Sequence, residues 1–385
     1  MQIQASLKEI LAGKTTDVYF IRAQEILKSE NKNPEVTAEI WTKNLPENYK
    51  WGIFTGLEEA LFLFKDLNID IWALPEGSIF YHREPVLTIK GKYLDFATLE
   101  TPLLGYICQA SGISTKAARC KVAAKDRKIL SFGARRMHPS LTPLIDRYAY
   151  LGGVDGVSAV LSGERLNIKP QGTIPHSVII ILGDTVKGAK AYDKAITEEI
   201  PRIILVDTFS DEKVETLRVA KALGKKLDAV RIDTPSSRRG SLLEIARELR
   251  EELDLHNYKN VGIFASGGLN EYNIVNLNQW VDGYGIGTCL SNATTINFSL
   301  DIVEIEGKPI TKKGKTSGMK MVFECTRCGM RKITINKDII SKCECGNPIK
   351  SLTQKIIENG RAIKEPETIN DIRKRVLTEI NYLDV

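Results

Sequence analysis

The sequence lacks long apolar runs and a recognisable export signal. Its longest apolar run, near residues 178–182, is far shorter than a membrane span, so we expect no membrane-spanning segment and no membrane partner. The first residues include Lys8, Glu9 and Lys14 and show no apolar stretch followed by a small-residue cleavage site. A secretory signal peptide is therefore not predicted, and we expect a cytoplasmic protein.

A strong charge excess is also missing. The formal net charge is +6 and the pI is near 8.8 over 385 residues, a mild excess that suits an anionic small substrate as well as a nucleic acid. The hydrophobic share of 43% and the charged share of 26% are those of an ordinary soluble globular protein. The length predicts two or three domains.

Cysteine is sparse through most of the chain and then clusters. Three of the seven cysteines are scattered, at Cys108, Cys120 and Cys289. In a reducing compartment, a late cluster of cysteines indicates metal binding rather than disulfides. The clustered residues are Cys325, Cys328, Cys343 and Cys345.

The cluster predicts a structural zinc site. Its halves, CTRC and CEC, are separated by a loop of fourteen residues, which brings four thiolates within reach of one tetrahedral ion. A glycine follows CTRC and permits a tight bend, whereas CEC is one residue shorter than the common spacing. Four sulfur ligands leave no open position, so we expect no catalysis by the metal. A nucleic-acid-binding ribbon is the alternative, but no aromatic residues for base stacking lie between its cations. Those cations are Arg327, Arg331, Lys332, Lys337 and Lys342.

The first part of the chain, residues 1–105, mixes helical and strand patterns. Residues 6–30 are helical in spacing with a break at Gly13, and residues 36–45 alternate like a strand. Residues 56–67 have helical spacing, and residues 79–93 suggest a hairpin that turns through Arg83, Glu84 and Pro85. This mixture predicts an α+β domain, followed by one or two long helices over residues 94–124.

The middle part, residues 106–295, has a different rhythm. Short apolar runs recur, each ending in a polar or glycine-rich tip, and helical spacing is plain in residues 211–223 and 241–253. Repeated βα units predict a parallel sheet, and about seven units favour a closed or nearly closed α/β barrel. No GxGxxG follows the first strand, which disfavours a dinucleotide-binding fold. The runs are 128–136, 154–159, 169–177, 202–208, 228–234, 260–268 and 281–288.

The last part, residues 296–385, is predicted to be a small appended domain. It contains the lysine-rich stretch ITKKGKTSGMK, the cysteine cluster and a terminal segment, 367–383, with helical spacing.

Charged residues recur at the tips of the predicted strands. In an α/β barrel the carboxyl ends of the strands share one face, and that face carries the active site. In VRIDTPS, Arg231 and Asp233 occupy alternate strand positions and so point to the same side. One such pair is compatible with a solvated surface, but five charged or titratable tips are better explained by a site. The tips gather Phe132, Arg135, Arg136, Asp155, Ser158, His176, Asp207, Arg231 and Asp233.

The last two tips are rich in glycine. Ser266, Gly267 and Gly268 follow one run, and Gly287 and Thr288 end the sequence GIGT on the next. Backbone amides in such turns hold anions, so we expect a phosphate site there, although turns alone also use glycine. Other residues also have plainer alternatives: Phe132 as core, His176 as a buried histidine, and Tyr19 as part of an apolar helix face.

Taken together, the motifs resemble those of the nicotinate phosphoribosyltransferases, within the type II phosphoribosyltransferase family. The resemblance covers roughly residues 10 to 295. It implies an incomplete α/β barrel beside an N-terminal α+β domain, and the cysteine-bearing tail resembles that of an archaeal-type branch. The motifs are DVYF at 17–20, SGIST at 111–115, SFGARRMHP at 131–139, GTIPHS at 172–177, LVDT at 205–208, VRIDT at 230–234, FASGG at 264–268 and GIGT at 285–288.

The resemblance implies the transfer of phosphoribose from 5-phosphoribosyl 1-diphosphate to nicotinate, a salvage step towards NAD. The ribosyl centre becomes cationic as diphosphate departs, and Asp207 and Asp233 are carboxylates suited to stabilise it. Magnesium would bridge the diphosphate oxygens. His176 and Arg231 complete the implied catalytic set. The implied substrate-binding residues are Tyr19, Phe132, Arg135, Arg136, Asp155, Ser158, Thr173, Ser266, Gly267, Gly268, Gly287 and Thr288.

Several details stay open at this level. The pyridine ring would lie between Phe132 and Tyr19, the latter reaching in from a neighbouring subunit, which implies a homodimer or higher oligomer. In related branches a histidine at the position of His176 is phosphorylated by ATP, but the residues before it differ here, so ATP coupling is undecided. Quinolinate and nicotinamide are alternative substrates. A zinc-ribbon nucleic-acid-binding protein on an inactive barrel is the alternative from another class.

Overall fold

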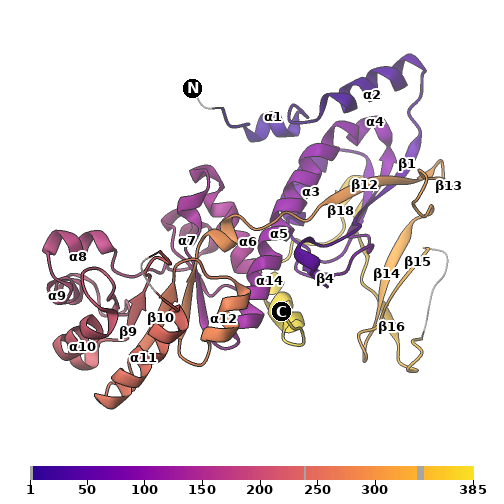
Figure 1. Ribbon diagram of the computed structural model, residues 1–385. Coiled ribbons are helices and arrows are strands. Elements are labelled where there is room, and N and C mark those ends of the chain that lie inside the picture. The colour runs from indigo at the N-terminus through magenta and orange to yellow at the C-terminus, as the bar shows by residue number, and fades with distance from the viewer. Residues whose placement is uncertain (1–2, 238–239, 336–341) are drawn as a thin grey trace. The chain divides into compact units, whose positions relative to one another are not determined.

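The computed structural model in Figure 1 describes residues 3–237, 240–335 and 342–385. The chain forms two compact units. The first unit comprises Met1–Thr115 and Thr294–Glu379, and the second comprises Lys116–Ala293 and Ile380–Val385. The long helix α5, Glu100–Ala124, runs from one unit into the other along the chain. The cysteine-bearing segment is thus grouped with the amino-terminal residues, and an independent domain of residues 296–385 stays a prediction.

The first unit is built on a seven-stranded antiparallel sheet of order β13-β12-β1-β5-β3-β17-β18. The early strands β1, β5 and β3 lie together at its centre and are flanked on each side by two strands from later in the chain. Side chains such as Ile40, Ile71 and Ile89 are fully buried at this centre. The strands are β1 Glu35–Thr42, β3 Ile69–Ala73, β5 Leu87–Lys92, β12 Phe298–Ile305, β13 Lys308–Pro309, β17 Gln354–Glu358 and β18 Arg361–Ala362.

The predicted helices of the first unit are present. Helices α1, Leu7–Leu11, and α2, Val18–Ser29, are separated near Gly13, whose φ of +68° is a conformation that glycine adopts without strain. Helix α3 covers Leu57–Leu61, the short α4 Tyr93–Phe96, and the terminal helix α14 Ile369–Ile380.

The predicted hairpin over residues 79–93 is wrong. Strand β4, Ile79–Phe80, pairs with β2, Gly52–Ile53, whereas β5 pairs with β1 and β3. Between them, Arg83 has a φ of +68° and Pro85 has no N–H to donate, so the chain leaves one sheet and enters another. A third, three-stranded sheet carries the first two cysteines; it is formed by β14 Lys320–Cys325, β15 Arg331–Ile335 and β16 Ile349–Ser351.

The second unit contains six parallel strands in the order β7-β6-β11-β10-β9-β8. Within the described residues, the outer strands β7 and β8 do not pair with each other, so the sheet is an incomplete barrel, as the motifs predict. The strands are β6 Lys128–Ser131, β7 Gly156–Val157, β8 Ile203–Leu205, β9 Ala229–Ile232, β10 Gly262–Ser266 and β11 Gly283–Ile286.

One of the seven predicted strand units is wrong. Residues 169–175 form a loop, and residues 176–177 already belong to α8, His176–Leu182. Pro170 and Pro175 lack the N–H that a strand ladder needs, and Pro175 becomes the N-cap of the helix.

Helices of the second unit follow its strands in sequence (Figure 1). The helices predicted over 211–223 and 241–253 are present as α10 and α11. None of the helices in the described ranges has both the length and the apolarity needed to cross a bilayer. The helices after α5 are α6 Thr142–Leu151, α7 Val160–Leu166, α8, α9 Thr185–Ala195, α10 Glu212–Leu223, α11 Leu242–Leu255, α12 Glu271–Leu277 and α13 Thr288–Ser291.

Candidate active site

Three neighbouring strands of the second unit end in polar side chains. In the register of the sheet, Leu205 lies beside Arg231, and Ala265 lies beside Ile232. Because the strands are parallel, Asp207, Asp233 and Ser266 leave the ends of β8, β9 and β10 in a row. The carboxyl edge of the sheet therefore gathers residues that are far apart in the sequence.

Asp207 is the buried centre of this edge. Its side chain is 1% exposed, and its Oδ1 lies 3.2 Å from His176 Nε2. Its Oδ2 accepts hydrogen bonds from the backbone N–H of Asp233 at 2.8 Å and from the Thr234 hydroxyl at 3.2 Å. Burial opposes ionisation of Asp207, but the bonds from His176 and the Asp233 backbone lower its pKa overall. The bond to Asp207 raises the pKa of His176, so the two side chains favour an ion pair.

Arg231 and Asp233 hold each other at the end of β9. Arg231 Nη2 donates to Asp233 Oδ2 at 3.1 Å. The other guanidinium nitrogens donate to Ser266 Oγ at 2.9 Å and to Thr173 Oγ1 at 2.7 Å. The Ser266 hydroxyl in turn donates to the second Asp233 oxygen at 2.8 Å. Burial lowers the pKa of Arg231, and the nearby carboxylates oppose that effect. Arg231 and Asp233, at alternate positions of VRIDT, thus pair with each other within a network that also includes Ser266 and Thr173.

Phe132 lies beside this network at the end of β6. The Arg231 guanidinium carbon is 5.0 Å from the centre of the Phe132 ring, within the range of a cation–π contact. A methyl group at Gly285 would lie 2.3 Å from the same ring, so only glycine fits there. The ring is half-buried and also contacts Phe264, with centroids 6.2 Å apart. Phe132 is therefore an anchored aromatic at the edge of the site.

The two glycine turns lie at the ends of adjacent strands. Gly267 and Gly268, after β10, have φ values of +92° and +73°, which favour glycine. A methyl group on Gly267 would also lie 3.2 Å from Asp233 Oδ1. Gly287, after the neighbouring β11, is the N-cap of α13, and Thr288 begins that helix. Both turns thus bring backbone to the edge that carries the charged network.

Not every predicted tip residue lies at this edge. Ser158 follows β7 and donates to the Ser131 carbonyl at 2.8 Å, as expected for a tip residue. Asp155 precedes β7 instead, where it accepts from the Ile129 N–H at 2.9 Å and from Lys121 Nζ at 3.0 Å. Its predicted position at the carboxyl ends is wrong, because the strand in VDGVSA is only Gly156–Val157 and the aspartate stands at its start.

Two predicted arginines and one tyrosine remain outside the network. Arg135 and Arg136 are exposed on a short 3-10 turn after β6. Tyr19 belongs to the first unit, where it is 56% exposed on α2. Its role against the pyridine ring stays a prediction.

The sequence reasoning overlooked Thr234 and Gly285. The Thr234 hydroxyl bonds to Asp207 and to Glu212 Oε1 at 2.5 Å, and so links the β9 tip to α10. Both residues are inside the quoted motifs VRIDT and GIGT, where a small polar residue and a glycine attract less attention than the charges beside them.

The four cysteines of the first unit come together as predicted. Their sulfur atoms all lie within 4.8 Å of one another. Cys325 and Cys345 are 3.5 Å apart, and Cys328 is 3.6 Å from both Cys343 and Cys345. Four sulfurs around one ion at about 2.3 Å would be separated by roughly 3.8 Å. The donor set therefore fits a tetrahedral metal ion.

The backbone of both cysteine turns is tight. Gly329 and Gly346 have φ values of +67° and +81°, and their N–H groups donate to the carbonyls of Cys325 and Cys343. The shorter spacing of CEC is thus compatible with the cluster. Arg331, one cation of the nucleic-acid alternative, donates to Glu84 at 2.9 Å inside the unit, which weakens that alternative. Lys337, another of them, lies outside the described residues.

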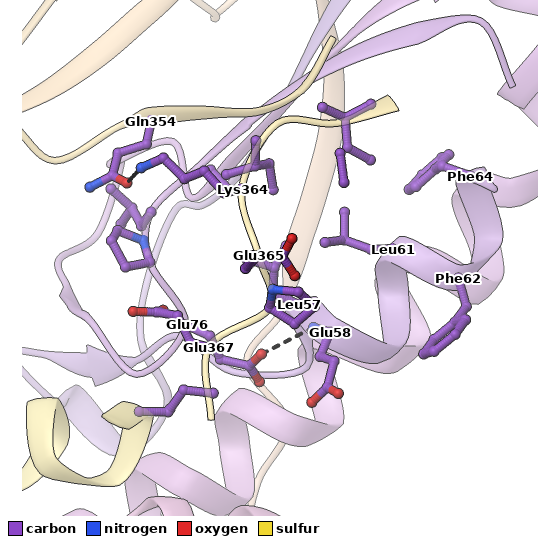
Figure 2. A pocket seen from close by; sticks show the side chains of 18 of the residues that line it. Leu57, Glu58, Leu61, Phe62, Phe64, Glu76, Gln354, Lys364, Glu365 and Glu367 are labelled. Atoms are coloured by element: carbon purple, nitrogen blue, oxygen red, sulfur yellow. Dashed lines mark hydrogen bonds between the residues drawn. The ribbon is translucent and has the colours of Figure 1, made fainter. Parts of the chain in front are cut away.

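A pocket of about 510 Å³ lies in the first unit (Figure 2). Leu57 and Leu61 of α3 form one wall with Phe62 and Phe64, and Gln354 and Lys364 lie across from them; Glu365 also lines the pocket. Lys364 donates to Gln354, so part of the polar rim is internally paired. None of the predicted active-site residues lines this pocket.

Two sequence profiles of a known family match the chain. The N-terminal domain of quinolinate phosphoribosyl transferase matches residues 17–111, and the C-terminal domain of the same family matches residues 113–301. A nicotinate phosphoribosyltransferase of Mycobacterium tuberculosis is 26% identical over 404 aligned positions, covering 94% of this chain and 85% of the relative.

Solved structures give the same fold. The crystal structure of nicotinate-nucleotide pyrophosphorylase from Pyrococcus furiosus superposes with a TM-score of 0.97, and its sequence is 47% identical to this one. The match covers 100% of this chain and 99% of the Pyrococcus furiosus chain. Human nicotinic acid phosphoribosyltransferase is 20% identical with a TM-score of 0.76, covering 96% and 94%, and shows the fold alone. Since the two profiles together span most of the sequence and one solved relative is similar along all of it, the chain belongs to the quinolinate phosphoribosyl transferase family, that is, the type II phosphoribosyltransferases.

Proposed function

We propose that this protein is a nicotinate phosphoribosyltransferase. It joins nicotinate to 5-phosphoribosyl 1-diphosphate and releases nicotinate mononucleotide and diphosphate, a salvage step towards NAD. The observation that carries the proposal is the network that joins Asp207, His176, Arg231 and Asp233 across the ends of β8 and β9. The nicotinate phosphoribosyltransferase of Mycobacterium tuberculosis named above supports the choice of reaction.

In this reaction the pyridine nitrogen forms a bond to the ribose C1 as the bond from C1 to diphosphate breaks. The bonding pair leaves with diphosphate, and positive charge develops on the sugar. Asp233 and Asp207 provide negative charge for this transition state, and such fixed charge acts strongly in a site shielded from water. The backbone bond from Asp233 to Asp207 fixes their relation before substrate binds.

The donor's phosphates are assigned to the two glycine turns and to cations. Backbone amides around Gly267, Gly268 and Gly287 with Thr288 suit the 5-phosphate, because turns of this kind direct N–H groups at anions. Magnesium would be held mainly by diphosphate and water, and would balance the charge of the leaving group. The exposed Arg135 and Arg136 fit the same anionic group.

Nicotinate is assigned to the space beside Phe132. Its ring would stack on the aromatic face, and Arg231 is the best-supported partner for its carboxylate, because the guanidinium already lies against that ring. Thr173 and Ser266 would then fix the guanidinium rather than touch the chemistry. Ser158 lies at the end of β7, the strand that pairs with β6. Asp155, tied to Lys121, has a supporting role in this scheme.

The proposal includes a homodimer, in which Tyr19 closes the pyridine site of a neighbouring subunit. Exposed apolar side chains on α2 support an interface there: Val18 is 59% exposed, Tyr19 56% and Ile26 62%. It also includes structural zinc at the four cysteines and a cytoplasmic location, because a reducing compartment keeps neighbouring thiols available for metal.

ATP coupling is a separable part of the proposal. If His176 accepts a phosphoryl group, γ-labelled ATP will give an acid-labile, base-stable adduct that is absent from His176→Ala. Labelling that persists in the alanine variant would remove His176 from that role.

The test of the main reaction is a comparison of three pyridines. Nicotinate, quinolinate and nicotinamide are supplied separately with the phosphoribosyl donor and Mg²⁺, and nucleotide and diphosphate are measured with and without ATP. We expect kcat/KM to be highest for nicotinate. Quinolinate is the second candidate, because the matching profiles bear its name; turnover of quinolinate with release of CO2 in preference to nicotinate would overturn the choice of substrate.

A further inference from the structure

Two cysteines of the second unit lie close together beside the proposed phosphate site. Cys120, in α5, is fully buried, and Cys289, in α13, is half-buried. Their sulfur atoms and a carboxylate oxygen of Glu271 all lie within 4.8 Å of one another. None of the described cysteines is part of a disulfide. Two sulfurs this close, on different helices, can be joined by a small movement.

The surrounding charges disfavour a metal ion at this cluster. Glu271 Oε1 lies 3.0 Å from Lys116 Nζ and 3.1 Å from Arg119 Nε, and all three side chains are at least nine-tenths buried. The carboxylate that would be the third ligand is thus already neutralised by two cations, which would also repel a metal ion. The cluster is therefore better suited to a reaction between the two thiols than to metal binding.

The two thiols are not equivalent. A hydrogen bond with Cys289 and burial both raise the pKa of Cys120, so Cys120 stays protonated at neutral pH. Cys289 is the more exposed of the two and is the sulfur that an oxidant from solution meets first.

We propose that Cys120 and Cys289 form a reversible disulfide that links α5 to α13 when the protein meets hydrogen peroxide. Peroxide oxidises the Cys289 thiol to a sulfenic acid and leaves as one water. The Cys120 sulfur then attacks the Cys289 sulfur, the S–S bond forms, the S–O bond breaks, and a second water departs with the proton of Cys120. Two thiols lose two electrons and two protons, and one peroxide becomes two waters.

The link acts on the end of β11. Gly287 is the N-cap of α13, and Cys289 is two residues further on. A methyl group at Gly133 would lie 3.0 Å from the Gly287 oxygen and 3.0 Å from Ser291 Cβ, so α13 is closely packed against the loop after β6. A bond to α5 therefore displaces the Gly287 turn. This consequence rests on the proposed function, because it takes that turn as part of the 5-phosphate site.

The disulfide itself is tested without any activity measurement. The full-length, zinc-loaded protein is treated with hydrogen peroxide, blocked with an alkylating reagent, digested, and searched by mass spectrometry for a peptide linking Cys120 to Cys289. Cys289→Ser removes the link, and Cys108→Ser, at a half-buried cysteine of the first unit, is the matched control. Because Cys120 is fully buried, Cys289→Ser carries the test rather than a change at Cys120.

We expect the linked peptide in the wild type and in Cys108→Ser, its loss in Cys289→Ser, and its reversal by dithiothreitol. Zinc content is measured in parallel, so that oxidation of the four-cysteine cluster is recognised separately. The inference is overturned if Cys289 stays reduced or passes to sulfinic acid with no linked peptide.

The effect of the disulfide on the phosphate site is measured as a change in the KM for the phosphoribosyl donor. In the oxidised wild type, the KM for 5-phosphoribosyl 1-diphosphate should rise roughly tenfold or more, since small displacements in a binding site have large effects. The KM of Cys289→Ser should not respond to peroxide. An unchanged KM in protein that carries the link overturns the coupling to the phosphate turn. A reduced wild type that makes no nucleotide counts against the proposed function and leaves the disulfide standing.

Discussion

The strand-tip network and the four-cysteine cluster are assembled in opposite ways. The network joins residues distant in the sequence, such as Asp207 and Asp233, through the pairing of the parallel strands β8 and β9. The cysteine cluster is built from two short turns, each closed by a glycine with positive φ. One arrangement therefore depends on the whole fold of the second unit, and the other depends on local backbone geometry.

Their charges differ in the same way. In the network, Asp207 is partnered by His176, and Asp233 by Arg231, so the network is stable without substrate. In the cluster, four sulfur atoms lie together, and their thiolate forms repel one another unless a cation holds them. The network is therefore expected to affect turnover, and the cluster is expected to affect stability.

The largest effect should come from Asp233→Asn. Loss of one negative charge facing the cationic transition state should lower kcat about 10²- to 10³-fold. The melting temperature should change little, because asparagine keeps the size of the side chain and can still accept from Ser266. The measurement is kcat at saturating substrates, with circular dichroism as the folding control. Near-normal turnover would remove Asp233 from the mechanism.

Replacement of Cys325 and Cys328 by serine should affect stability rather than turnover, the opposite of the effect expected for Asp233→Asn. The double variant should lose its metal, and its melting temperature should fall, because metal binding contributes to folding free energy. The turnover per folded molecule should stay within about twofold of the wild type, because four sulfur ligands leave the ion no open position. Metal content by mass spectrometry and kcat of the folded fraction are the readouts. Lost chemistry in a fully folded, metal-free variant would contradict a structural role.

Phe132→Ala should have a smaller effect, on one substrate only. Stacking on an aromatic face contributes on the order of 1 kcal/mol, so the KM for nicotinate should rise about fivefold. The KM for the donor should change little. If both rise together, Phe132 is better described as part of the core that also contacts Phe264.

The smallest effect should be a pH dependence of stability from the pair of His176 and Asp207. The pKa of His176 is raised above its ordinary value of 6.5, so the pair's contribution is present below pH 6.5 and is lost as pH rises through the raised pKa. The pKa of Asp207 is lowered below 3.8, so its contribution is present above that pH and is lost as pH falls through the lowered pKa. Melting temperatures between pH 5 and 9 should show the upper loss, and His176→Gln should flatten it. An identical pH profile in that variant would show that the pair does not contribute.

The sequence predicted the network better than it predicted the course of the chain around it. Arg231 and Asp233 follow an apolar run with alternate spacing, so a shared face follows from strand geometry alone. The predicted position of Asp155 at a strand tip was wrong. The bounds of the two-residue strand β7 depend on its pairing with β6 rather than on its own residues, and Asp155 precedes it.

The hairpin near residue 83 and the strand over 169–177 were wrong for a related reason. In both segments prolines lack the backbone N–H that strand pairing needs. The conformation then depends on contacts with residues distant in the sequence, such as the pairing of Ile79–Phe80 with β2. The cysteine turns, in contrast, were predictable because their geometry is local.

The most direct test of the account is the stoichiometry of one reaction under two metal conditions. Nicotinate, the phosphoribosyl donor and Mg²⁺ are incubated with the wild type, either zinc-loaded or zinc-stripped and still folded, and nicotinate mononucleotide and diphosphate are counted. We expect equal amounts of both products, at similar initial rates per folded molecule in the two samples. Absence of the nucleotide in the zinc-loaded sample, or its loss on stripping zinc from folded protein, would contradict the assignment of the chemistry to the strand tips.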